Sequence, residues 1–104
     1  MKSKSFITQL AALGKSILPQ GASLWLYGSQ ARGEATPDSD WDLLVLLDKA
    51  KREPSDVRYS DALQDFGFDQ NQYVSPQIYT RSEWAAMHFM PFYKNVEHDK
   101  IVLV

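Results

Sequence analysis

Two aspartates, Asp40 and Asp42, lie where a polar loop meets an apolar run. Side chains two residues apart on a strand project to the same face, so both carboxylates can contact one cation. Mg²⁺ takes hard oxygen ligands, and one or two carboxylates commonly hold it together with the phosphates of a substrate. The pair therefore predicts a site for Mg²⁺ or Mn²⁺ with Asp40 and Asp42 as its ligands.

A second candidate group lies upstream, where Gly28 and Ser29 follow a short apolar run. Glycine lets the backbone approach a phosphate closely, and serine adds a hydroxyl and an N–H at the start of a helical turn, where anions are favoured. Gly-Ser turns and acidic pairs are each common alone. Their combination, from strand through Gly-Ser, helical turn and polar loop to paired aspartates, predicts a site for a metal-bound nucleotide.

The elements that must position these residues follow from the apolar pattern. Steps of three and four residues predict amphipathic helices, and short apolar runs bounded by turn formers predict strands. The expected elements are a helix over 5–18, a strand over 23–27, a helical turn over 30–33, a strand over 41–47, a helix over 55–66, a strand over 73–80 and a helix from 80 onward. This order predicts an α/β (α+β) fold with a small mixed sheet of three to four strands flanked by helices.

Several local features refine this expectation. Residues 43–47 show no polar alternation, which favours a strand covered on both faces. Pro76 favours an edge strand or a bulge, and Pro91 is expected to interrupt or kink the last helix. Residues 48–56 are interpreted as a solvated connection, and the apolar tail 101–104 is expected to form a short strand or to pack on the core.

Composition limits the classes of function. With 104 residues, 44% of them hydrophobic, the chain is expected to form one domain over residues 1–104. A net charge of −2 disfavours nucleic acid as the main partner. The absence of cysteine excludes thiol catalysis and cysteine-ligated zinc. No segment has the pattern of a membrane span or a cleaved leader, so we expect a cytoplasmic protein without membrane contact.

The segment Gly28–Asp42 resembles the nucleotidyltransferases of the DNA polymerase beta-like superfamily, in particular the minimal (MNT) type. In that family a strand ends in Gly-Ser, and ten residues separate this pair from Asp-x-Asp, as residues 30–39 do here. The resemblance implies that Gly28 and Ser29 position a nucleoside triphosphate and that Asp40 and Asp42 are catalytic metal ligands. It further implies that Arg32 and Ser39 belong to the nucleotide-binding segment, with Arg32 reaching a phosphate.

The implied reaction moves a nucleoside monophosphate, AMP in the first instance, from ATP or another NTP to a hydroxyl group, with pyrophosphate leaving. Small members resemble the antitoxins of HEPN/MNT toxin–antitoxin pairs, which implies a helical HEPN protein as partner and acceptor. The surplus of apolar side chains over residues 84–93 is consistent with a protein interface, in a homo- or hetero-oligomer. A small-molecule acceptor would call for a second domain, and polymerisation of nucleic acid is disfavoured by charge.

One departure from the family pattern supports a different interpretation. The family commonly places a third carboxylate on the next strand, but residues 73–79 contain no acid, and Ser75 or Gln77 stands at the corresponding position. Asp69 lies upstream with nothing to place it in the site. The alternative is therefore a catalytically weak or inactive binding module that neutralises a partner by occlusion. His88 and His98 have no partner at ligand spacing and are interpreted as structural or solvated.

Overall fold

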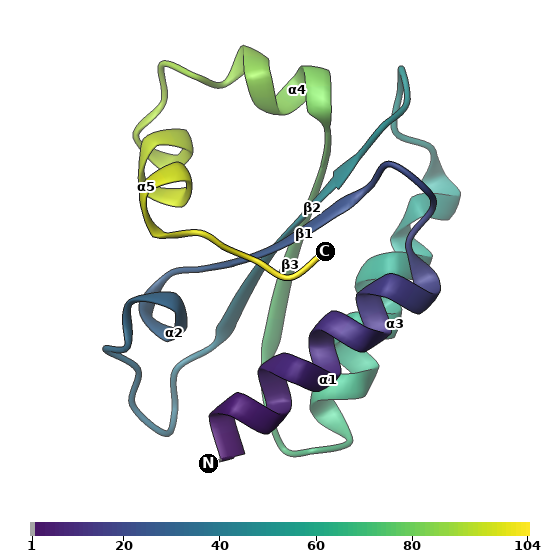
Figure 1. Cartoon of the computed structure of the whole chain (residues 1–104). Coiled ribbons are helices and arrows are strands. Elements are labelled where there is room, and N and C mark those ends of the chain that lie inside the picture. The colour runs from purple at the N-terminus through teal and green to yellow at the C-terminus, as the bar shows by residue number, and fades with distance from the viewer. Residues whose placement is uncertain (1) are drawn as a thin grey trace.

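The computed structural model describes residues 2–104 and contains a four-stranded mixed sheet with strand order β3-β2-β1-β4 (Figure 1). Strand β1 pairs with β2 and with β4 in antiparallel fashion, and β2 pairs with β3 in parallel. In chain order the elements are α1 (Lys2–Ile17), β1 (Ser23–Tyr27), α2 (Ser29–Arg32), β2 (Trp41–Leu47), the 3-10 helix η1 (Pro54–Asp56), α3 (Val57–Phe68), β3 (Val74–Thr80), α4 (Arg81–Ala86), α5 (Pro91–Asp99) and β4 (Ile101–Val102). The predicted fold class is confirmed.

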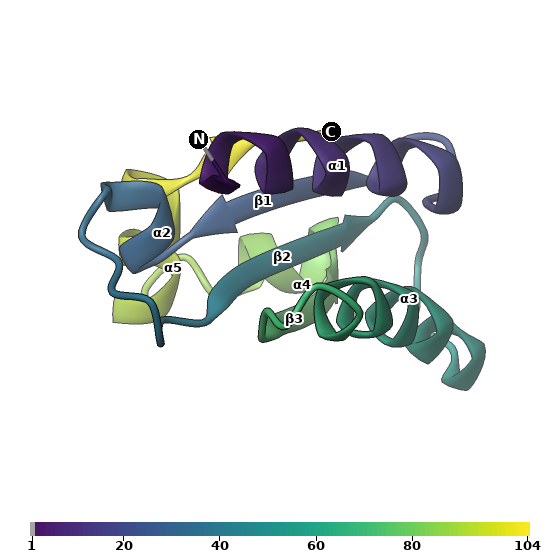
Figure 2. The ribbon, with the colours of Figure 1, turned by 90° about the horizontal axis from the view of Figure 1, so that it is seen from below.

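Helices cover both faces of the sheet. Figures 1 and 2 show α1 and α3 on one face and α4 and α5 on the other. Strand β2 is the centre of both layers, because Leu43, Val45 and Leu47 point toward α1 and α3 while Leu44 and Leu46 point toward α4 and α5. The unbroken apolar run of β2 is therefore explained by burial on both faces, as its sequence predicted.

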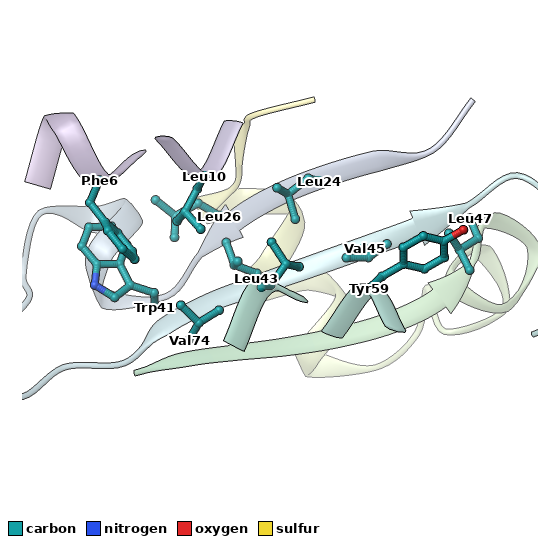
Figure 3. Packing of buried hydrophobic residues seen from close by; sticks show 11 residues of the cluster. Phe6, Leu10, Leu24, Leu26, Trp41, Leu43, Val45, Leu47, Tyr59 and Val74 are labelled. Atoms are coloured by element: carbon teal, nitrogen blue, oxygen red, sulfur yellow. The ribbon is translucent and has the colours of Figure 1, made fainter. Parts of the chain in front are cut away.

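The larger cluster lies beneath α1 and α3. Phe6 and Leu10 of α1 and Tyr59 of α3 meet the inner residues of β1 and β2 there (Figure 3). Apolar burial of this kind contributes about 25 cal/mol per Å² removed from water, which makes β1 and β2 the rigid base from which the neighbouring polar loop projects.

The C-terminal half contains two helices, so the interruption expected at Pro91 is confirmed. Helix α4 ends at Ala86, and Pro91 begins a new helix, α5, rather than kinking the old one. Proline suits the first helical turn, since its missing N–H would have no partner there. A capping box begins α4: the Thr80 hydroxyl accepts from the Glu83 N–H at 3.1 Å, and Glu83 Oε1 accepts from the Thr80 N–H at 2.8 Å.

The two edges of the sheet are formed by β3 and β4. Strand β3 is an edge strand, as Pro76 predicted. Arg52 Nη1 donates to the carbonyl oxygen of Ile78 on this strand at 3.4 Å. At the other edge the tail forms β4, and Leu103 and Val104 pack against the larger core cluster, so both expectations for the tail are confirmed.

The connection 48–56 contains a buried carboxylate, contrary to the interpretation that it is simply solvated. Asp56 is 3% exposed; its Oδ2 accepts from the Glu53 N–H and its Oδ1 from Lys49 Nζ, each at 2.7 Å. These bonds compensate the cost of burying the charge. Within residues 2–104, none of the helices is both long and apolar enough to cross a membrane.

Candidate metal and nucleotide site

The two aspartates lie at the start of β2. Asp40 is exposed and immediately precedes the strand, and Asp42 is half-buried opposite Tyr27 of β1. Between them, Trp41 turns to the opposite face, where its ring lies 4.7 Å from that of Phe6 and its Nε1 donates to Gln72 Oε1 at 2.9 Å. Burial of Trp41 fixes the strand and thereby directs the Asp42 carboxylate away from α1 and α3, as the alternation predicted.

Gly28 closes the site from the side of β1. Its φ of 76° and ψ of −159° fall in a region essentially restricted to glycine. A Cβ at this position would overlap Oδ2 of Asp42, so the absence of a side chain is what lets the two segments come together. The Gly28 carbonyl oxygen accepts from the N–H groups of Ala31 and Arg32 at 3.0 and 3.1 Å, which starts the single turn of α2.

The site concentrates negative charge without neutralising it. Burial, and after it the charge of Asp40, raises the pKa of Asp42, while Arg32 acts in the lowering direction. Burial and the nearby Asp42 likewise raise the pKa of Tyr27 to about 12, so this phenol stays protonated. Within residues 4–104, no hydrogen bond or ion pair to the carboxylate of Asp40 or Asp42 is formed.

This electrostatic arrangement fits a divalent cation. Two carboxylates that repel one another and have no partner among the described side chains are stabilised by a hard cation that both can contact. The Ser29 hydroxyl also forms no hydrogen bond in the part of the chain that the structure describes, and it lies at the start of α2 beside Gly28. Gly28, Ser29, Asp40 and Asp42 are thus gathered at adjacent ends of β1 and β2.

Arg32 and Ser39, unlike Ser29, form hydrogen bonds to other residues of the protein through their side chains. Arg32 donates from Nη1 to Asp99 Oδ2 at 2.6 Å and from Nε to Glu34 Oε2 at 3.2 Å. The Ser39 hydroxyl accepts from the Thr36 N–H at 2.9 Å, and the Ser39 carbonyl oxygen accepts from Gln30 Nε2 at 3.3 Å. Ser39 therefore shapes the loop that delivers Asp40, and its contact with a nucleotide stays a prediction, as does that of Arg32.

The strand register shows which residues of β3 lie beside Asp42, where a third carboxylate would be expected. Ser75 is the partner of Asp42 and Gln77 that of Leu44, so both β3 side chains belong to the face that carries Asp42. Asp69 caps the end of α3, the helix that covers the opposite face. Among the residues with described placement, no three acidic, histidine or cysteine side chains are grouped for a metal.

Sequence reasoning missed Asp99, which follows Arg32 by 67 residues and still forms an ion pair with it. No local pattern could have linked the two, since the contact depends on how α5 packs. Two surface hollows elsewhere are lined by neither Asp40 nor Asp42. The larger, of about 900 Å³, lies between α1 and the loop 33–37 and is lined by uncharged residues only.

Nearly the whole length of the chain resembles a known protein family. No curated protein matches the chain. A family model described as "Nucleotidyltransferase domain" matches residues 5–104, a range that begins within α1 and includes every later element and all of the site residues above. The chain therefore belongs to the nucleotidyltransferase domain family, whose general reaction is nucleotidyl transfer.

Proposed function

We propose that this domain transfers AMP from ATP to a hydroxyl group on a partner protein, using Mg²⁺ or Mn²⁺ held by Asp40 and Asp42. The observation that supports this most directly is the half-buried Asp42, which packs against the Gly28 backbone near Asp40. Neither carboxylate forms an ion pair among the described residues. The family supports nucleotidyl transfer in general, and the choice of AMP, metal and acceptor is the proposal.

Each residue has a defined role in the proposed reaction. The bound metal would neutralise the charge that develops on the triphosphate. Gly28 and Ser29 hold the phosphates through backbone N–H groups and a hydroxyl, and Asp40 and Asp42 hold the metal. The acceptor oxygen forms a bond to the α-phosphorus, the bond between the α-phosphorus and its bridging oxygen breaks, and pyrophosphate leaves. Because β3 carries no acid, a group of the partner or the nucleotide accepts the hydroxyl proton.

The proposed partner is a helical HEPN-type protein, whose toxicity the domain would neutralise as an antitoxin. Exposed apolar side chains between α4 and α5 support a protein contact: Phe89 is 69% exposed and Met90 lies beside it at the surface. The remainder of the aromatic cluster, including Trp84 and Phe92, is packed in the smaller core and is not available to a partner.

A second candidate function is neutralisation by occlusion without catalysis. The register favours it, because Ser75 rather than a carboxylate lies opposite Asp42. In this case the domain would bind ATP, the partner or both, and the partner would stay unmodified.

The test is transfer of label from ATP to a purified HEPN-type partner in the presence of Mg²⁺. ATP labelled on the α-phosphate should label the partner, and ATP labelled on the γ-phosphate should not, because pyrophosphate leaves. Asp40→Asn and Asp42→Asn should abolish the transfer. Stable complex formation and neutralisation without any label would favour occlusion, and labelling by γ-labelled ATP would contradict nucleotidyl transfer.

A further inference from the structure

Asp99, at the C-terminal end of α5, has an unusual combination of burial and charge. Its side chain is 8% exposed, and its Oδ2 accepts from Arg32 Nη1 at 2.6 Å. Its Oδ1 lies 3.1 Å from Nδ1 of His98, which is 87% exposed. Arg32 is therefore the cation that approaches Asp99 from the site, and the contact joins α5 to α2.

The same contact restricts the guanidinium of Arg32. Glu34 binds Nε and Asp99 binds Nη1, so two edges of the planar group are occupied while Nη2 has no partner among the described residues. Arg32 also lies beside the candidate site, because its N–H donates to the carbonyl oxygen of Gly28 at 3.1 Å and Gly28 packs against Asp42. An arginine fixed in this way keeps donors in a rigid fork that matches the oxygens of a phosphate.

The short helix α2 does not by itself fix the side chain of Arg32. Helix α2 is only four residues long, and the Gly33 that ends it is left-handed, so the helix itself does little to fix a long side chain. An arginine loses considerable side-chain entropy when a ligand orders it, and prior orientation by a carboxylate removes part of that loss.

We propose that Asp99 is a positioning residue that orients Arg32 toward the phosphates of a bound nucleotide, so that the last helix is part of the site. This inference rests on the proposed nucleotide-binding function. It assigns to α5 a role in recognising the triphosphate in addition to its packing on the sheet.

The experiment measures the affinity of the full chain for Mg²⁺–ATP and for adenosine, which has no phosphates. Arg32→Ala and Asp99→Ala should each weaken Mg²⁺–ATP binding about tenfold, the scale on which supporting residues act, and should leave adenosine unaffected. The double variant should bind Mg²⁺–ATP little more weakly than either single variant, because each change alone already breaks the contact between Arg32 and Asp99. Asp99→Asn keeps the shape of the side chain and should fall between wild type and Asp99→Ala.

Glu97→Gln is the matched control, because Glu97 lies on the same helix and pairs with Lys100 and Trp84 rather than with Arg32. It should change the melting temperature without changing affinity for Mg²⁺–ATP. Wild-type affinity in folded Asp99→Asn, with a loss in Arg32→Ala, would overturn the positioning role, as would equal losses for ATP and adenosine. A wild-type chain that binds no Mg²⁺–ATP would instead contradict the proposed function itself.

Discussion

At the scale of single residues, Gly28 determines whether the Asp42 carboxylate can occupy its place. Gly28→Ala is expected to destabilise the fold by about 1–3 kcal/mol, because its backbone conformation is nearly restricted to glycine. The added Cβ would also displace Oδ2 of Asp42, so binding of Mg²⁺–ATP should be lost. Urea unfolding and calorimetric titration measure the two effects separately.

Gly33 provides the control for this substitution. It also has a positive φ, 74°, but a Cβ there would meet no other atom within 4 Å. Gly33→Ala should therefore cost about 1 kcal/mol of backbone strain and leave the affinity for Mg²⁺–ATP nearly unchanged. Equal loss of affinity in the two variants would show that backbone strain, rather than the contact with Asp42, accounts for the effect.

Asp42 makes the stability of the metal-free protein depend on pH. Its pKa is raised in the folded state, so the folded state binds the proton more tightly than the unfolded state does. The contribution of Asp42 to the free energy of unfolding should consequently be highest below the ordinary pKa of aspartate and fall as the pH rises through the raised value. Asp42→Asn should remove most of this fall and should raise the melting temperature at neutral pH in EDTA.

Melting curves of wild type and Asp42→Asn across this range, with and without Mg²⁺, measure the effect. Mg²⁺ should stabilise the wild type at neutral pH and leave Asp42→Asn unaffected, since a bound cation compensates the buried charge. Because other acids, Asp56 among them, contribute stability of the opposite sign, the test is the difference between the two metal-free proteins. A wild type that gains stability relative to Asp42→Asn as the pH rises through this window would contradict the assigned direction of the shift.

At the scale of elements, the junction between η1 and α3 depends on one buried carboxylate. Burial alone would raise the pKa of Asp56. Hydrogen bonds from the Glu53 N–H and from Lys49 nevertheless hold this pKa below its ordinary value. Asp56→Ala should thus destabilise the fold by about 2 kcal/mol at neutral pH through lost charge-assisted hydrogen bonds. This stabilisation is present above the ordinary pKa of aspartate and disappears as pH falls through the lowered value, so the difference between variant and wild type should shrink in acid.

Asp61→Ala, an exposed change on the next helix, is the control and should have little effect on chemical denaturation at either pH. A constant difference between Asp56→Ala and wild type down to strongly acidic pH would mean that packing, rather than charge, explains the loss.

The elements themselves were predictable where the evidence was local. The apolar run of β2, the Thr80–Glu83 cap and the edge position signalled by Pro76 all follow from a few neighbouring residues. The interruption at Pro91 also followed from the sequence. The end of α4 at Ala86 was not predicted, because an apolar stretch rich in aromatic residues favours a helix that continues up to the proline. Burial of Asp56 also escaped prediction, since its compensating partners become apparent only when the turn is formed.

At the scale of the whole molecule, the sheet brings together residues that the sequence could place only in order. Spacing predicted that Gly28, Ser29, Asp40 and Asp42 belong to one site, and the antiparallel pairing of β1 with β2 explains why they meet. The contact of Arg32 with Asp99 depends on tertiary packing across 67 residues and had no local signal. The sequence alone shows that β3 contains no acid. Which of its residues lies opposite Asp42 became known only from the strand pairing.

The central claim is that Asp40 and Asp42 form a metal-dependent nucleotide site. Equilibrium binding of ATP, measured with Mg²⁺ and with EDTA, tests it most directly. The wild type and Asp38→Asn, a change at an exposed aspartate of the same loop, should bind ATP only with Mg²⁺, while Asp40→Asn and Asp42→Asn should bind at least about tenfold more weakly. ATP binding that persists in EDTA, or is equal in all four proteins, would contradict the claim.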